Sequence, residues 1–412
     1  MKWQNVIGVL CAAVLLFSRC PSHLLHPEFW AEDGADWLQY AYNYGLSSLT
    51  MPAGGYLQTL SRLGGLIAVQ FPLTYAPLIF AVIAFIVQLS PVMLLLSRRG
   101  EALLPSLPAR LLIVLYYVGV PNSYEVYINL TNAMWCFALT GFLLLVLPKP
   151  QTVAGTTLEA GCLVLVGLSG PFSVFLAPLA WWQVVELRRC ADAMKRVLYA
   201  VLLTLCALLQ AAYVEMSGQN RLENIGATFS RLVHILADQI FLGGIIGGKD
   251  VWGLLRGGFW VQTWPAALWC LFAVILGLIA FYKGPSAYRQ LAVMATLMLG
   301  GALKAPMVSE FVPQWKVMQY PGIGDRYYII PMIAWFSALV VVAAGELRFG
   351  LHWVARGLVV CCAVGMVTDW SYTPYVPVAY HEAAKMFDRA PVGTAVTFPG
   401  NPPGWQFTLT KH

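Results

Sequence analysis

The chain has 412 residues, of which 59% are hydrophobic and only 11% are charged, and its formal net charge is +6. Ordinary soluble domains carry about 25% charged residues. The composition, with a mean hydropathy of +0.69, therefore excludes a typical soluble globular protein and favours an all-α polytopic membrane protein. The positive charge requires no nucleic-acid partner, because cytoplasmic loops of membrane proteins collect Lys and Arg.

Apolar runs along the chain predict its transmembrane helices. They cover residues 4–18, 72–97, 109–121, 131–147, 158–168, 172–186, 197–215, 264–282, 288–303, 327–345 and 353–368. Several are shorter than the ~20 residues of a full span, so we predict about 11 helices in a range of about 9–12. The first run lacks a small-residue cleavage site, and we expect it to be a retained helix rather than a signal peptide.

Basic residues predict the orientation of these helices. With the N-terminus inside, the short inner turns hold Lys2, Arg98, Arg99, Arg110, Lys149, Arg188, Arg189, Lys195, Arg196, Lys283, Arg289, Arg348 and Arg356. Because Lys and Arg collect in cytoplasmic turns, we predict a cytoplasmic N-terminus and an outward-facing C-terminus. This topology requires two helices, not one, around the break "SGPFS" at 169–173.

The long polar segments then all face outward. They are residues 19–71, 216–263, 304–326 and 369–412. We predict one membrane domain at 1–368, with 19–71 as its first outer loop, and a short outward-facing tail at 369–412. Any functional site is expected on this outer side.

The first outer loop concentrates acid and aromatic residues in the stretch "PEFWAEDGADW", 27–37. Glu32 and Asp33 either are solvated or capping groups for the helix that follows, or form a functional pair among tryptophans at the membrane interface. Aromatic residues favour that interface, and we expect interfacial helices from Asp36 onward and in "GGYLQTLSRLGGLIAVQF". The second of these carries Tyr56 near its start and Arg62.

Two further outer segments carry polar residues next to helices. "NLTNAMW" contains Asn129, Asn132 and Trp135, a combination of amides and an indole that suits a sugar; the alternative is an N-cap in an interfacial loop. Lys304 ends one apolar run, and the pair Asp325–Arg326 precedes the next. Charges at the membrane boundary are functional candidates, with snorkelling anchors as the alternative.

The motifs "FWAEDGADW", "GGYLQTLSRL", "NLTNAMW", "LSGPFS" and "GDRYYIIP" together resemble the GT-C superfamily of integral membrane glycosyltransferases, over most of residues 1–345. The resemblance implies a bacterial cytoplasmic-membrane enzyme. It would move a sugar from a polyprenyl-phosphate carrier to a lipid-linked glycan or another surface acceptor on the outer face. Many members carry a large soluble C-terminal domain, whereas this tail is short, which leaves acceptor recognition open.

Such a transfer needs a base for the acceptor hydroxyl and cations for the leaving phosphate. We predict Asp33 as the base, with Glu32 orienting the acceptor or holding an optional divalent cation; no other cofactor is expected. The predicted phosphate-binding residues are Arg326, Lys304 and Arg62. The predicted sugar- or acceptor-binding residues are Tyr56, Asn129, Asn132, Trp135 and Asp325. One base predicts inversion at the anomeric carbon.

Two other functions remain open at this point. A transporter or flippase of lipid-linked sugars would use the same cations and aromatic residues without a base, and paired broken helices or inverted repeats would favour it. An O-antigen ligase or polymerase-like protein would also face outward. All three place the chain in the synthesis or modification of cell-surface glycans in the membrane.

Overall fold

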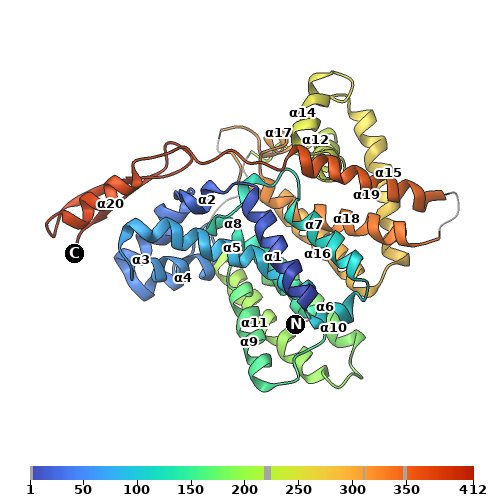
Figure 1. The fold of residues 1–412 in the computed structure, drawn as a ribbon, viewed down its shortest axis with the longest axis horizontal. Helices are drawn as coiled ribbons and strands as arrows, with labels where there is room; N and C mark the ends of the chain where they lie inside the picture. The colour runs from blue at the N-terminus through green and yellow to red at the C-terminus, as the bar shows by residue number, and fades with distance from the viewer. Residues whose placement is uncertain (1–2, 218–223, 310, 347–349) are drawn as a thin grey trace. The chain divides into compact units, whose positions relative to one another are not determined.

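The computed structural model describes residues 3–217, 224–309, 311–346 and 350–412, which form a largely helical chain (Figure 1). Lys2 and Arg348, which belong to the predicted inner turns, lie outside the described residues. The chain divides into two compact units. Unit 1 comprises Met1–Arg19, Leu95–Glu125 and Asn220–Tyr372; unit 2 comprises Cys20–Leu94, Val126–Gln219 and Thr373–His412.

Every predicted apolar run coincides with a helix. These helices are α1 (Trp3–Ser18), α5 (Ala76–Leu95), α7 (Leu107–Val118), α8 (Leu130–Val146), α9 (Val153–Gly167), α10 (Phe172–Glu186), α11 (Ala193–Met216), α15 (Thr263–Lys283), α16 (Ser286–Lys304), α18 (Ile329–Ala344) and α19 (Leu351–Thr368). The break between α9 and α10 is a real turn, in which Gly170 adopts a φ of +96° that favours glycine.

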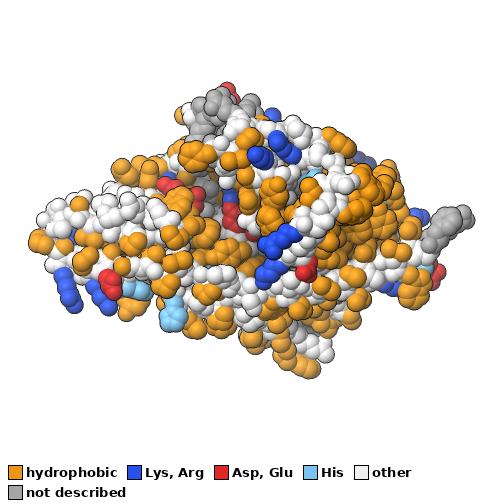
Figure 2. All heavy atoms as spheres, turned by 90° about the horizontal axis from the view of Figure 1, so that it is seen from above, with side chains coloured by type: hydrophobic (Ala, Val, Ile, Leu, Met, Phe, Trp, Pro, Cys, Tyr) orange, Lys and Arg blue, Asp and Glu red, His pale blue; other side chains and the backbone are white. Residues whose placement is uncertain are grey.

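Among the described residues, five helical segments are long and apolar enough to cross a membrane. They are Leu73–Leu95, Ala193–Met216, Phe229–Ile246, Thr263–Lys283 and Leu351–Thr368. Hydrophobic side chains also cover much of the face seen in Figure 2, as a lipid environment requires. The chain is thus a helical protein suited to a bilayer, while the total number of spans and the sidedness of its termini stay predictions.

The segment Phe229–Ile246 is absent from the predicted helices, because the sequence places it in the outer segment 216–263. It consists of α12 (Phe229–His234), a π-helix (η5, Ile235–Phe241) and α13 (Gly243–Ile246). Its hydropathy is interrupted by His234, Asp238 and Gln239, all of which are buried. These polar residues hide the helix from a search for apolar runs.

Unit 1 is built around α18, whose residues from Ile329 to Leu339 are all buried. Helices α7, α15, α16 and α19 pack against it, and Tyr116 of α7 stacks on Phe336 of α18 with ring centroids 3.9 Å apart. Its shorter helices are α6 (Arg98–Leu103), α14 (Gly248–Arg256), α17 (Gln314–Met318) and the 3₁₀ turns η4 (Tyr124–Val126, which runs into unit 2) and η6 (Asp325–Tyr327).

Unit 2 is built around α8, in which every residue from Leu130 to Val146 is buried. Helices α4 (Thr59–Ala68), α9 and α10 pack against α8, and α11 packs on α9 and α10. The first outer loop contributes α2 (Ser22–Leu25), a π-helix (η1, Asp33–Leu38), α3 (Gln39–Tyr44) and the 3₁₀ turn η2 (Gly45–Thr50), and the 3₁₀ turn η3 (Leu73–Tyr75) precedes α5. Helices therefore form in both places where the sequence predicts interfacial helices.

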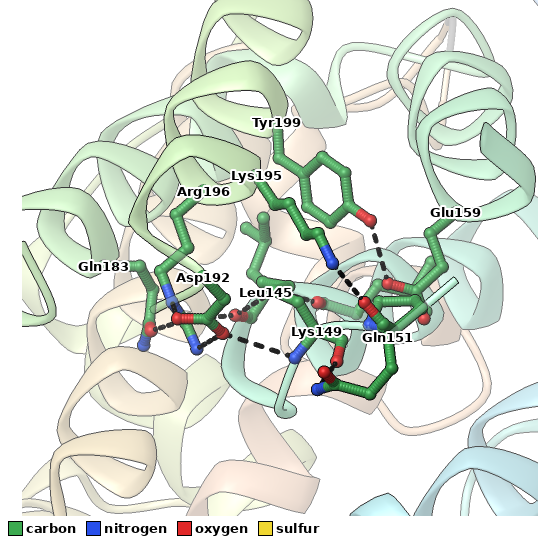
Figure 3. Close-up of polar contacts among 11 residues, drawn as sticks. Leu145, Lys149, Gln151, Glu159, Gln183, Asp192, Lys195, Arg196 and Tyr199 are labelled. Carbon is green, nitrogen blue, oxygen red and sulfur yellow. Dashed lines mark hydrogen bonds and ion pairs between the residues drawn. The ribbon is translucent and has the colours of Figure 1, made fainter. Parts of the chain in front are cut away.

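Buried cations hold the C-terminal end of α8 (Figure 3). Lys149 donates to the carbonyl oxygens of Leu144 and Leu145, and Arg196 also donates to Leu145 O. Arg196 forms an ion pair with Asp192 at 2.8 Å. Cations at this end offset the partial negative charge of the helix terminus. The basic cluster that the sequence places in an inner turn thus anchors α8 to the α10–α11 turn.

The C-terminal tail adds a β-hairpin that the all-α expectation omits. After α20 (Tyr380–Arg389), strands β1 (Ala395–Pro399) and β2 (Gln406–Thr410) pair antiparallel, with a register from Ala395↔Thr410 to Pro399↔Gln406. This segment, red in Figure 1, returns to the first outer loop, drawn in blue, and packs against η1, α3 and η3. The tail is therefore part of unit 2.

Candidate functional site

Four of the five sequence motifs meet in unit 2. The acidic stretch "FWAEDGADW" forms the start of η1, "GGYLQTLSRL" leads into α4, "NLTNAMW" begins α8, and "LSGPFS" is the α9–α10 turn.

The Asp33 carboxylate is seated on the N-terminus of α8. Its Oδ1 accepts hydrogen bonds of 2.8 Å from both the backbone N–H and the hydroxyl of Thr131, and its Oδ2 accepts one of 3.2 Å from the N–H of Leu130. The side chain is only 3% exposed. Asp33 therefore satisfies free N–H groups of a helix that begins almost a hundred residues later, instead of capping the helix that follows it.

Burial raises the pKa of Asp33 to about 7, although the hydrogen bonds from Thr131 and Leu130 act in the opposite direction. The negative charge of neighbouring Glu32 adds to the rise. Glu32 itself is partly exposed. The two adjacent carboxylates thus differ in exposure: Asp33 is buried, and Glu32 is partly exposed.

The side chain of Arg62 in α4 binds backbone carbonyl groups of the first outer loop. Its guanidinium donates to the carbonyl oxygens of Asp36 (2.8 Å) and Met51 (3.1 Å), and lies over the rings of Trp37 and Tyr40. The side chain is buried, and this burial lowers its pKa. These contacts order the loop around the acidic pair. Its predicted role in binding a donor phosphate stays a prediction.

The predicted sugar-binding residues of unit 2 lie at the start of α8 and in the loop before α4. Asn129 is the N-cap of α8 and accepts a hydrogen bond of 2.9 Å from the N–H of Asn132. Asn132 and Trp135 are buried, with the Trp135 ring edge-on to Phe172. Tyr56 is partly exposed in a short backbone bridge with Ala53. The capping alternative holds for Asn129, and the sugar contacts stay predictions.

A buried glutamine joins the α4 motif to the α9–α10 turn. Gln210 of α11 accepts from the N–H of Leu57 (2.8 Å) and donates to the carbonyl oxygens of Leu57, Gly167 and Gly170. Gly170 N–H in turn donates to Leu57 O, at 2.9 Å. We missed Gln210 because it lies within a long apolar run. A lone amide in such a run was the available signal.

The remaining predicted residues belong to unit 1. Arg326 forms an ion pair with Glu125, donates to the Tyr327 hydroxyl at 3.2 Å and lies over the Tyr327 ring. Lys304 is exposed at the C-terminal end of α16. Asp325 is buried, and burial together with the nearby charge of Asp369 raises its pKa to about 8. The roles predicted for these residues stay predictions.

Unit 1 also holds a polar network that the sequence did not reveal. Asp369 accepts from the N–H groups of Gly248 (2.6 Å) and Asn122 (3.0 Å), so it caps α14. Arg19 donates to the carbonyl oxygens of Val118, Val120 and Asp369, among others. Arg19 and Asp369 lie at the ends of predicted helices. At such positions the sequence does not distinguish a charge that anchors the helix from one with a function.

A second buried pair lies in the unpredicted helix Phe229–Ile246. His234 Nδ1 and Asp238 Oδ2 are 2.9 Å apart, and the Trp260 indole donates to Asp238 Oδ1 at 2.6 Å. Both members of the pair are buried. An ionisable pair within an apolar helix is a functional candidate of its own.

The optional divalent cation at Glu32 and Asp33 stays a prediction. Within the described ranges, no group of three or more His, Cys, Asp or Glu side chains is placed to hold a metal ion. Both oxygens of Asp33 already accept hydrogen bonds from α8.

Within unit 2 the Asp33 carboxylate thus binds the start of α8, and the α9–α10 turn binds the start of α4. Comparison with known proteins found no matching family model and no similar curated protein.

Proposed function

We propose that the chain is a membrane glycosyltransferase that moves a sugar from a polyprenyl-phosphate carrier to an acceptor on the outer face of the membrane. The observation that supports this most is the Glu32–Asp33 pair. One carboxylate is locked on the end of the central helix α8, and the other is partly exposed beside it. A partly exposed carboxylate next to a fixed one suits proton transfer from an acceptor hydroxyl.

Within this proposal the two carboxylates have different tasks. The sequence favours Asp33 as the base, but its burial and its three hydrogen bonds to Leu130 and Thr131 suit a group that fixes the turn. Glu32 is the accessible member, and we assign it the proton transfer. A base has to reach the hydroxyl oxygen within hydrogen-bond distance, which an enclosed carboxylate does not do without rearrangement.

The reaction proposed is a single displacement. The acceptor hydroxyl transfers its proton to Glu32 while its oxygen bonds to the anomeric carbon. The bond from that carbon to the phosphate oxygen breaks, and the polyprenyl phosphate leaves with the electron pair. One base without a covalent intermediate inverts the anomeric configuration. Charged donors match the oxygens of a leaving phosphate, and the phosphate-binding roles predicted for Arg62, Lys304 and Arg326 stay predictions.

Purified full-length protein in lipid nanodiscs, given polyprenyl-phosphate sugars and an extract of envelope glycans, tests this proposal. Transfer of the sugar with release of polyprenyl phosphate, detected by mass spectrometry, is the expected result. The exposed-site variant Glu382→Gln serves as a control and is expected to match the wild type, because Glu382 lies on the outer face of α20. Absence of transfer from every donor tested would contradict the proposal.

A transporter of lipid-linked sugars is the second candidate, favoured by the buried His234–Asp238 pair in an apolar helix. Ionisable pairs within membrane helices commonly mark ion or proton pathways. Proteoliposomes loaded with a fluorescent lipid-linked sugar distinguish the two. Movement of the lipid between leaflets without any change in its mass would select transport, and loss of the sugar from its carrier would select transfer.

A further inference from the structure

We propose that the C-terminal segment, residues 373–412, is a positioning element for the Glu32–Asp33 pair, acting through the backbone of Asn401 and the ring of Phe407. This role deepens the proposed transfer and rests on it. The contacts that carry it lie entirely within unit 2. They connect the hairpin to the residues immediately before and after the two carboxylates.

Asn401 holds the backbone that leads into Glu32. Its N–H donates to the carbonyl oxygen of Phe29 at 2.8 Å, and its own carbonyl accepts from the N–H of Ala31 at 2.5 Å. These two bonds bracket Trp30 in a short parallel bridge. Ala31 has a φ of +43°, a conformation that is unfavourable for alanine. The bond from Asn401 therefore supports a strained residue directly before Glu32.

Asn401 is itself fixed by the tail. Its side-chain amide pairs with the backbone of Val376 in both directions, accepting from the N–H and donating to the carbonyl, each at 3.0 Å. The side chain is buried. The neighbouring Tyr375 stacks on Trp30 with ring centroids 5.3 Å apart. The tail thus binds the loop on both sides of the bridge.

Phe407 closes the other side of the acidic pair. A Cβ atom added to Gly34, the residue after Asp33, would lie 2.4 Å from the Phe407 ring. The ring has little room to move, because it stacks on Phe398 with centroids 5.1 Å apart and meets Phe29 edge-on at 6.0 Å. Five positions further along the chain, at the start of α3, Gln39 donates to Thr408 O at 3.0 Å and extends the same contact.

The hairpin therefore fixes the backbone from Phe29 to Gly34, and the two carboxylates lie inside that interval. Misplacing a reacting group by about 1 Å costs on the order of 100-fold in rate. A loosened hairpin is expected to lower kcat while leaving the affinity for the donor's lipid tail, and hence its KM, nearly unchanged. A merely structural contribution would lower the amount of active protein without this split.

A compensating pair of substitutions tests the contact. Gly34→Ala is expected to lower kcat by about tenfold or more, because the new methyl group displaces the Phe407 ring. Adding Phe407→Val removes the ring atoms that collide with it, and we expect the double variant to recover most of the loss. Gly161→Ala, at an exposed position of α9 where an added Cβ atom meets nothing within 4 Å, is the matched control and is expected to match the wild type. A double variant no better than Gly34→Ala, or a fully active Gly34→Ala, would overturn the positioning role.

Hydrogen exchange of the full-length protein separates this inference from the proposed reaction. In Gly34→Ala and in Asn401→Ala we expect faster exchange of the amides at 29–38, in the double variant slower exchange than in Gly34→Ala, and in Gly161→Ala a wild-type pattern. If the wild type transfers no sugar but the exchange follows this order, the transfer is wrong and the positioning contact stands. If exchange at 29–38 is unchanged in both single variants, the positioning contact is wrong whatever the activity.

Discussion

At the scale of single residues, adjacent carboxylates acquire different properties from their surroundings. Asp33 is enclosed by N–H groups of α8, and Glu32, one residue earlier, is partly exposed. The sequence identifies the pair but not which member is accessible, because burial here depends on Leu130 and Thr131, far along the chain. Free N–H groups at a helix start attract a carboxylate whether or not that carboxylate reacts.

The hydrogen bonds between Asp33 and the start of α8 predict that the amide variant of Asp33 is less stable. In Asp33→Asn, one oxygen still accepts from Thr131, but the new NH₂ group faces the N–H of Leu130, where Asp33 Oδ2 now accepts. Two donors then oppose each other, and we expect a loss of about 1–3 kcal/mol in stability. Thermal unfolding in detergent measures it, with Glu382→Gln as the control. An unchanged melting temperature would show that the hydrogen bonds of Asp33 to Leu130 and Thr131 do not stabilise the fold.

The buried carboxyl of Asp325 predicts a pH dependence of stability. Its folded pKa of about 8 lies above the ordinary value, so the folded protein holds a proton that the unfolded chain releases. This contribution is complete below the ordinary pKa of about 3.9 and is lost as the pH rises through about 8. Asp33 and Glu28, with pKa values raised to about 7, act in the same direction.

We therefore expect the melting temperature of the wild type to fall between pH 6 and pH 9, and that of Asp325→Asn to fall less, because an amide stays neutral. The exposed variant Asp388→Asn is the control and is expected to follow the wild-type curve. Equal slopes for Asp325→Asn and the wild type would show that Asp325 does not carry this proton.

At the scale of elements, polar side chains inside apolar helices join segments that the sequence presents as separate motifs. Gln210 connects the start of α4 with the α9–α10 turn through four hydrogen bonds to backbone groups. Lys149 and Arg196 hold the other end of α8. Helix α8 is thus fixed at both ends by charged or amide groups. Its first residues donate the hydrogen bonds that Asp33 accepts.

Gln210→Leu tests this connection. Leucine makes none of the hydrogen bonds and leaves backbone groups of Leu57 and Gly170 without their partner, so we expect a loss of about 2 kcal/mol or more. Leu209→Ala, at an exposed position on the same helix, is the control for the effect of changing a side chain of α11 that makes no such hydrogen bonds. Melting temperatures of the purified proteins measure the difference, and equal effects of the two variants would contradict the assigned role.

At the scale of the whole molecule, hydropathy predicts the apolar helices well, because burial in lipid requires runs of apolar residues. It misses Phe229–Ile246, whose run is interrupted by His234, Asp238 and Gln239, and each of these is buried with a specific partner. It also misses the tail hairpin, whose strands become regular only against Phe29 and η1. Both elements depend on contacts between residues that are distant in sequence, and the spacing of residues along the chain does not predict such contacts.

The same limit applies to the candidate site. The motifs predict the acidic pair and the start of α8 as one site, and unit 2 brings them together. They do not predict that Arg62 binds the loop backbone at Asp36. They also do not predict that Asn401 binds the backbone of Phe29 and Ala31. The whole of unit 2, including its C-terminal tail, is therefore needed to describe the environment of Glu32.

The kinetics of Glu32→Gln test the central claim most directly. With purified protein in nanodiscs, the initial rate of sugar transfer from its polyprenyl-phosphate donor is measured for the wild type and for Glu32→Gln. We predict a fall in kcat of about 100-fold to 10,000-fold, because the amide does not accept the proton of the acceptor hydroxyl. A Glu32→Gln protein that transfers sugar at the wild-type rate would contradict the account.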